Sequence, residues 1–127
     1  MPAGLPSLTR AGKLAKRAAR VGFGWPDTGS VVAKIEEELG EVEEALAESD
    51  EAAKTEEIGD LLFAVANLAR HAGIDPEAAL RDANAKFVRR FEHVEARCRE
   101  DEVEIAQAGL ERLDGYWNEI RKADKSA

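Results

Sequence analysis

Two segments decide the fold: Lys34–Leu46, KIEEELGEVEEAL, and Glu56–Ala69, EEIGDLLFAVANLA. In both, apolar residues recur at steps of three and four, which is the spacing of an amphipathic helix with about 3.6 residues per turn. The polar stretch at residues 49–55 separates them and serves as a connection. The sequence therefore predicts an all-α protein in which these two helices pack as an antiparallel hairpin.

Four acidic residues border the apolar stripes of the two helices: Glu38 and Glu41 on the first, Glu57 and Asp60 on the second. Residues three apart lie one above the other on a helix, so a hairpin can bring the four carboxylates together. Two such charges about 4 Å apart repel by roughly 4 kcal/mol at an effective dielectric near 20. A hard divalent cation offsets this repulsion, and oxygen ligands favour Mg²⁺ or Mn²⁺. The alternative is an ordinary acidic helix surface.

The composition limits the classes of function. The chain has 127 residues, enough for one domain with a core, and a net charge of −8. That charge argues against stable binding to nucleic acid or to membranes, because it repels phosphate groups. No apolar run reaches the roughly 18 residues that span a membrane, and no signal peptide is expected. Cys98 is the sole cysteine, which excludes an intramolecular disulfide and leaves a thiol zinc site without support. We expect a cytoplasmic protein.

Glycine, proline and polar runs divide the chain. Residues 1–7 are expected to be a flexible lead, residues 8–122 a single domain, and residues 123–127 a flexible tail. Trp25 lies in a loop with two glycines and a proline, where it either plugs the end of the core or stacks on a base. Thr28 or Ser30 is expected to cap the helix that follows.

The first predicted helix, residues 8–21, is strongly basic and contains no acid. Its cations either form a solvated face that balances the negative charge of the rest of the chain, or form a positive edge of a binding site that attracts an anionic substrate. A DNA-binding arm is a weaker alternative, because no aromatic residues are interleaved with the charges. These cations are Arg10, Lys13, Lys16, Arg17 and Arg20.

An ordered set of motifs resembles the MazG nucleoside triphosphate pyrophosphohydrolases. The resemblance extends over about residues 5–122. It implies an all-α helical bundle that forms a homodimer, with a homotetramer as the alternative. It also implies hydrolysis of the α–β phosphoanhydride bond of a nucleoside triphosphate to a monophosphate and pyrophosphate. The motifs are Gly22–Asp27, Lys34–Glu41, Glu56–Phe63, Asn67–His71 and Ala83–Phe91.

By position, the resemblance gives each site residue a role. The ligands of Mg²⁺, for which Mn²⁺ can substitute, would be Glu38, Glu41, Glu57 and Asp60, with Glu37 and Glu56 in support. The triphosphate contacts would be Lys86, Arg90 and Lys34, and the residues near the sugar or base would be Asn84 and Trp117. A carboxylate beside the metal, Glu37 or Glu41, would orient or deprotonate the attacking water, and the choice between them stays open.

Three functions are compatible with these observations. The first is a Mg²⁺-dependent nucleoside triphosphate pyrophosphohydrolase that cleans the nucleotide pool. The second is a helical dimerisation or regulatory module without catalysis, and the third is a narrow dUTP or dCTP pyrophosphatase. The presence of every predicted ligand argues against the second. A homodimer is expected because the helices carry more apolar surface than one small bundle can bury.

Overall fold

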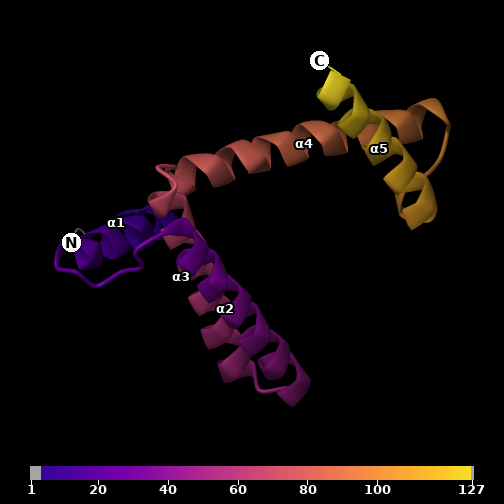
Figure 1. Cartoon of the computed structure of the whole chain (residues 1–127). Helices are drawn as coiled ribbons and strands as arrows, with labels where there is room; N and C mark the ends of the chain where they lie inside the picture. Colours follow the sequence, from indigo (N-terminus) through magenta and orange to yellow (C-terminus); the bar gives the residue numbers. More distant parts are fainter. Residues whose placement is uncertain (1–3, 127) are drawn as a thin grey trace. The chain divides into compact units, whose positions relative to one another are not determined.

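The computed structural model describes residues 4–126. These residues form five α-helices and one short 3₁₀ helix, and contain no strand (Figure 1), so the all-α prediction is confirmed. No helix among them is both long and apolar enough to cross a membrane. The helices are α1 (Ser7–Arg20), α2 (Thr28–Glu48), α3 (Glu51–His71), α4 (Pro76–Glu100), η1 (Ile105–Gln107) and α5 (Leu110–Ser126).

The chain divides into two compact units with the boundary after Ala79. The first unit holds α1, α2, α3 and the first residues of α4, and the second holds the rest of α4, η1 and α5. A single domain over residues 8–122 stays a prediction. Of the lead expected at residues 1–7, residues 1–3 lie outside the described part of the chain, and Ser7 already belongs to α1.

The hairpin of α2 and α3 has a tight connection. Ser49 adopts the left-handed conformation, with a φ of 58°, and Asp50 caps the next helix. The Asp50 carboxylate accepts hydrogen bonds from the backbone N–H groups of Ala52 at 3.0 Å and Ala53 at 3.2 Å. Because only these two residues separate the helices, the chain reverses at once, and α2 and α3 lie side by side as an antiparallel pair (Figure 1).

The cap of α2 is Asp27, so the prediction of Thr28 or Ser30 was wrong. Asp27 has an extended backbone, and its carboxylate accepts a hydrogen bond from the backbone N–H of Ser30 at 2.8 Å. An aspartate in this conformation provides an acceptor for a free N–H group of the first turn. The helix therefore begins at Thr28, directly after its cap. The same hydrogen bond lowers the pKa of Asp27.

Small side chains form most of the interior of the first unit. Val31 and Ala45 of α2 are buried, as are Ala64 and Ala66 of α3 and Ala15 of α1. Small residues allow the helices to approach closely, but they bury little apolar area. Larger apolar side chains of α2 and α3 remain exposed, among them Val32, Leu39, Leu46, Ile58, Leu62 and Val65. The hairpin therefore presents an apolar face that its own unit does not cover.

The second unit has a core of Val94, Cys98 and Tyr116. Tyr116 also donates a hydrogen bond of 2.5 Å from its hydroxyl to the carboxylate of Asp101, at the end of α4. The guanidinium of Arg97 lies 4.9 Å from the centre of the Tyr116 ring. These contacts attach α5 to the end of α4 through one aromatic residue.

The flexible tail expected at residues 123–127 stays a prediction, although α5 continues to Ser126. Asp124 lies within this segment and pairs with two arginines of α4. Its distances are 2.7 Å to Nη2 of Arg89 and 2.9 Å to Nε of Arg90. The polar composition of the tail suggested a free end, whereas these ion pairs hold its helical turn against α4.

Replacing Tyr116 with phenylalanine is expected to lower the melting temperature at neutral pH, with a smaller difference in acid. The hydrogen bond from Tyr116, followed by the charge of Arg97, lowers the pKa of Asp101 in the folded protein. A lowered carboxyl pKa adds stability above the unfolded value and loses it as the pH falls through the folded value. Thermal unfolding of both proteins from pH 7 to pH 3 measures how far their melting temperatures approach each other in acid. A difference in melting temperature that stays constant with pH would contradict the prediction.

Candidate metal and nucleotide site

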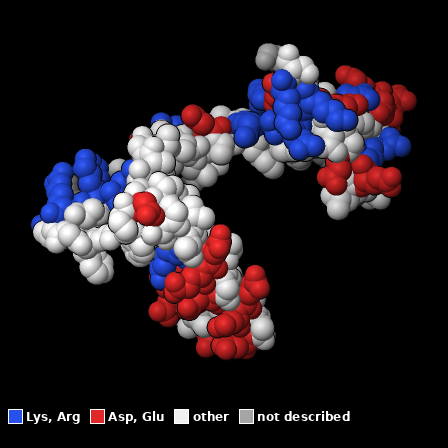
Figure 2. All heavy atoms as spheres, in the orientation of Figure 1, with Lys and Arg blue, Asp and Glu red and all other residues white. Residues whose placement is uncertain are grey.

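Three carboxylates converge between α2 and α3. One oxygen each from Glu38, Glu57 and Asp60 lies within 4.8 Å of the other two. Glu38 is buried, Glu57 is half-buried and Asp60 is exposed, so the group reaches from the helix interface to the surface. Figure 2 shows the acidic side chains gathered over the α2–α3 hairpin. The i, i+3 spacing on α3 and the antiparallel pairing together produce this cluster.

The cluster is electrostatically strained without a cation. The pKa of Glu57 is raised, first by its partial removal from water and then by the negative charges of Glu41, Asp60 and Glu38. Both causes disfavour the ionised form, which is the usual result when carboxylates share a site. A divalent ion reverses this preference, and a ligand set made only of carboxylate oxygens suits Mg²⁺ or Mn²⁺. The residues present therefore fit such a metal.

Lys34 lies beside the cluster on α2. Its Nζ atom is 3.0 Å from an oxygen of Glu38 and 3.3 Å from an oxygen of Glu37. The hydrogen bond to Glu38, together with the weaker one to Glu37, raises the pKa of Lys34. Lys34 is thus a stable positive charge that balances part of the buried carboxylate and remains at the edge of the acidic group.

The other predicted acids lie around the trio. Glu41 follows Glu38 by one turn of α2 and is exposed, outside the group of three, although its charge contributes to the raised pKa of Glu57. Glu37 accepts a hydrogen bond from Lys34, and its side chain is mostly exposed. Glu56 is exposed on α3, and its charge acts on Glu57 as well. The ligand role of Glu41 and the catalytic roles of Glu37 and Glu41 stay predictions.

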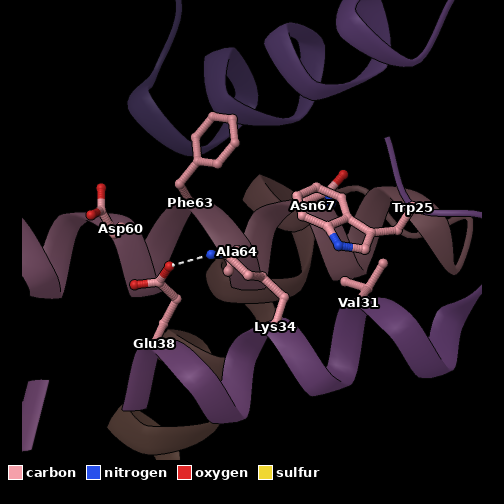
Figure 3. A pocket seen from close by; sticks show the side chains of 8 residues that line it. All are labelled: Trp25, Val31, Lys34, Glu38, Asp60, Phe63, Ala64 and Asn67. Carbon is pink, nitrogen blue, oxygen red and sulfur yellow. Dashed lines mark ion pairs between the residues drawn. The ribbon is translucent and has the colours of Figure 1, made fainter. Parts of the chain in front are cut away.

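A cavity of about 210 Å³ adjoins the acidic cluster. In Figure 3 the carboxylates of Glu38 and Asp60 stand at one end, and Trp25 with Asn67 at the other. Asp60 and Asn67 are seven residues apart on α3, or about 10 Å along the helix axis. The cavity therefore offers a charged end and an aromatic end. Its lining is completed by Val31, Lys34, Phe63 and Ala64.

Asn67 is a polar residue of this cavity that the sequence analysis did not assign to the site. It is 4% exposed, and its Oδ1 atom accepts a hydrogen bond of 3.0 Å from Nε of Arg70. That bond orients the amide, so its NH₂ group is the part left for a molecule in the cavity. A signal was available in the sequence, because Asn67 lies two turns after Asp60 on the same side of α3.

Trp25 lines the cavity and is 38% exposed, so it does not plug the core. Its loop is tied to the end of α3, because Nε2 of His71 lies 3.1 Å from the carbonyl oxygen of Trp25. A carbonyl can only accept, so Nε2 carries the proton, and Nδ1 can accept from the hydroxyl of Thr28 at 3.4 Å. His71 thus holds the loop that carries the indole.

The remaining predicted residues belong to the second unit. Asn84 and Lys86 are exposed on α4. The guanidinium of Arg90 pairs with Asp124 at 2.9 Å and lies 5.7 Å from the ring centre of Trp117. The ion pair uses Nε of Arg90, and the negative charge of Asp124 offsets part of the attraction of this guanidinium for an anion. The roles of these four residues toward a nucleotide stay predictions.

Comparison with known proteins agrees with this geometry. A MazG nucleotide pyrophosphohydrolase domain matches residues 27–95. The chain is 44% identical over 126 residues to a nucleoside triphosphate pyrophosphohydrolase of Escherichia coli K12, which covers 98% of this chain and 48% of that protein. It is 41% identical over 122 residues to the nucleoside triphosphate pyrophosphohydrolase/pyrophosphatase MazG of Thermotoga maritima, which covers 96% and 47%.

The chain spans about half the length of these curated relatives. The domain match takes in both acidic helices, α2 and α3, and more than half of the residues. The chain belongs to the MazG nucleotide pyrophosphohydrolase domain family.

Proposed function

We propose that this chain is a Mg²⁺-dependent nucleoside triphosphate pyrophosphohydrolase that cleaves the α–β phosphoanhydride bond and serves to clean the nucleotide pool. The observation that carries the proposal is the carboxylate trio, of which Glu38 and Asp60 line the charged end of a cavity whose other end is aromatic. This arrangement suits a ligand with phosphates at one end and a base at the other. The names of the two long relatives describe the same class of activity.

Glu38, Glu57 and Asp60 would hold the metal, with Glu41 as a fourth ligand. When bound, Mg²⁺ supplies neutralisation of charge on the phosphoryl oxygens and a lowered pKa for bound water, and Mn²⁺ can supply the same. Lys34 would contact a phosphate oxygen from its position beside Glu38, and Lys86 and Arg90 would add positive charge to the triphosphate. Such fixed cations stabilise the charge that develops in phosphoryl transfer.

Glu41 is the better candidate for orienting the water. Its negative charge lies close enough to Glu57 to affect that carboxyl group, and no cation is paired with it among residues 4–126. Glu37, in contrast, accepts a hydrogen bond from Lys34. A carboxylate such as Glu41 beside the metal would accept the proton of the attacking water, as the water oxygen bonds to one phosphorus and the bond from that phosphorus to the α–β bridging oxygen breaks.

The nucleoside would occupy the aromatic end of the cavity. The indole of Trp25 would stack on the base, and the NH₂ group of Asn67 would donate to an acceptor atom on the base or sugar. Since Arg70 holds the amide in one orientation, Asn67 favours ligands that present an acceptor at that position. Every base and sugar presents such an acceptor, so the choice between a broad enzyme and the narrower alternative, a dUTP or dCTP pyrophosphatase, rests on the substrate panel described below. Asn84 and Trp117 stay proposals for additional contacts to sugar or base.

The homodimer predicted from the sequence would cover the apolar face of α2 and α3. We expect light scattering to give the mass of two chains, and Leu62→Lys to shift it to one, because Leu62 is 53% exposed in this face. Val21→Lys is the matched control, since Val21 is 84% exposed at the end of α1. A monomeric wild-type protein would refute the expectation, and a mass of four chains would mean that dimers pair.

The activity is tested by incubating the chain with a panel of nucleoside triphosphates, with and without Mg²⁺, and separating the products by chromatography. Monophosphate and pyrophosphate, formed only with metal, are expected. Diphosphate and orthophosphate would mean that another bond is cut. Rapid turnover of one base alone would select the narrow pyrophosphatase. No product with any nucleotide would favour the non-catalytic dimerisation or regulatory module.

A further inference from the structure

A second hollow of about 340 Å³ lies in the first unit, between α1 and the turn that joins α3 to α4. Three of its lining side chains are cationic: Lys13 and Lys16 from α1, and Arg70 from the end of α3. The hydroxyl of Thr9 and the glycines at positions 12 and 73 lie among them. Figure 2 shows the basic side chains gathered over α1, apart from the acidic surface of the α2–α3 hairpin.

These three cations have no carboxylate within ion-pair distance in the described part of the chain. The hollow contains one acid, Asp75, whose carboxylate already accepts a hydrogen bond of 3.0 Å from the backbone N–H of Glu77. Glu77 in turn accepts a hydrogen bond of 3.5 Å from Thr9. The lining of the hollow thus carries three positive charges against one negative charge, in a protein whose net charge is −8.

The three cations come together only in the tertiary structure. Lys13 and Lys16 are exposed and lie one turn apart on α1, where the sequence alone fits a solvated basic face equally well. Arg70 joins them from another helix and is half-buried, with its Nε atom bonded to Asn67 at 3.0 Å. This bond leaves the two Nη groups of the guanidinium for a ligand, and their planar geometry suits a phosphate.

We propose that this hollow is a second anion site that binds a condensed phosphate chain, either free pyrophosphate or the phosphates of a second nucleotide. Lys13, Lys16 and the Nη groups of Arg70 would contact the phosphate oxygens. The site lies outside the acidic cluster, and its lining includes none of the carboxylates proposed to bind the metal.

Arg70 also connects the hollow to the cavity beside the acidic cluster, since it lines the first and orients Asn67 in the second. An anion that draws the guanidinium toward Lys13 changes the geometry of the Arg70–Asn67 hydrogen bond. Binding in the hollow would therefore alter how the nucleoside cavity presents its amide, and by linkage the nucleoside would alter binding of the anion. This coupling rests on the proposed function, whereas anion binding does not.

Binding is tested by calorimetric titration of the metal-free chain with inorganic pyrophosphate and, separately, with ATP in a chelating buffer. We expect saturable binding that weakens about tenfold or more in the Lys13→Gln/Lys16→Gln variant, through loss of charged hydrogen bonds. Arg10→Gln/Arg17→Gln removes the same charge from α1 at positions that do not line the hollow, and should change binding much less. The tighter of the two ligands identifies the source of the phosphate chain.

The coupling is read from the side-chain NH₂ signals of Asn67 in nuclear magnetic resonance spectra. Pyrophosphate is expected to shift these signals in the wild type but not in Arg70→Lys, which keeps the charge and removes the Nε donor. Absent binding, or equal weakening in both double variants, would overturn the site. Binding without any shift at Asn67 would overturn the coupling. Either result is independent of hydrolysis, so an inactive enzyme would not conceal it.

Discussion

Asp60→Asn is expected to lower nucleotide turnover about a thousandfold, the rate equivalent of losing several kcal/mol of metal-dependent stabilisation. The same change is expected to raise the melting temperature of the metal-free protein. Asp60 lies within 4.8 Å of Glu38 and Glu57, and its charge contributes to the raised pKa of Glu57. Removing that charge relieves repulsion that only a cation otherwise offsets. Initial rates in Mg²⁺ and thermal unfolding in chelator measure the two effects.

Glu38→Gln separates the two effects. It should lose turnover as severely, but it should not gain stability, because Lys34 loses the carboxylate that lies 3.0 Å from its Nζ atom. Glu48→Gln removes an exposed charge near the end of the same helix and should change neither quantity greatly. Full turnover in Asp60→Asn would remove the proposed metal site. A lower melting temperature in that variant would show that the trio is not under repulsion.

Trp25→Ala is expected to raise the KM for nucleotide about tenfold to a hundredfold while changing kcat little. Base stacking on an aromatic ring contributes about 1–3 kcal/mol, and Trp25 lines the cavity beside the acidic cluster. An interaction made equally with substrate and transition state appears in KM rather than in kcat. Steady-state kinetics with the best substrate of the panel provide the measurement.

Trp117→Ala is the matched comparison. The ring of Trp117 lies 5.5 Å from that of Phe87 and borders the core of the second unit, so its truncation should chiefly lower the melting temperature. If KM rises with the loss of Trp117 and stays unchanged with the loss of Trp25, the base is held by Trp117, as the family resemblance implies. That outcome would contradict the nucleoside role of Trp25 and leave the metal site unaffected.

The local sequence pattern was sufficient to predict the helices and the acidic edge of this chain. Apolar spacing identified the helices, and the i, i+3 acids on α2 and α3 pointed to a shared edge before any fold was known. The local pattern predicted the wrong cap for α2. Asp27, and not Thr28 or Ser30, caps α2, because its carboxylate accepts a hydrogen bond from the backbone N–H of Ser30. Near the C-terminal end of α5, Asp124 is bound by arginines some 35 residues earlier in the chain, a contact that no local pattern indicates.

By itself, the sequence determined the helical class, the two acidic motifs and the family, because each depends on residues close together along one helix. Which side chains meet across helices was decided only by the tertiary structure. Packing α2 against α3 brought Glu38 to Glu57 and Asp60 while Glu41 stayed outside the trio. The same packing joined Trp25 to Asn67 in one cavity, and Arg70 to the lysines of α1 in another. Distances between helices depend on packing and capping, which helical periodicity does not encode.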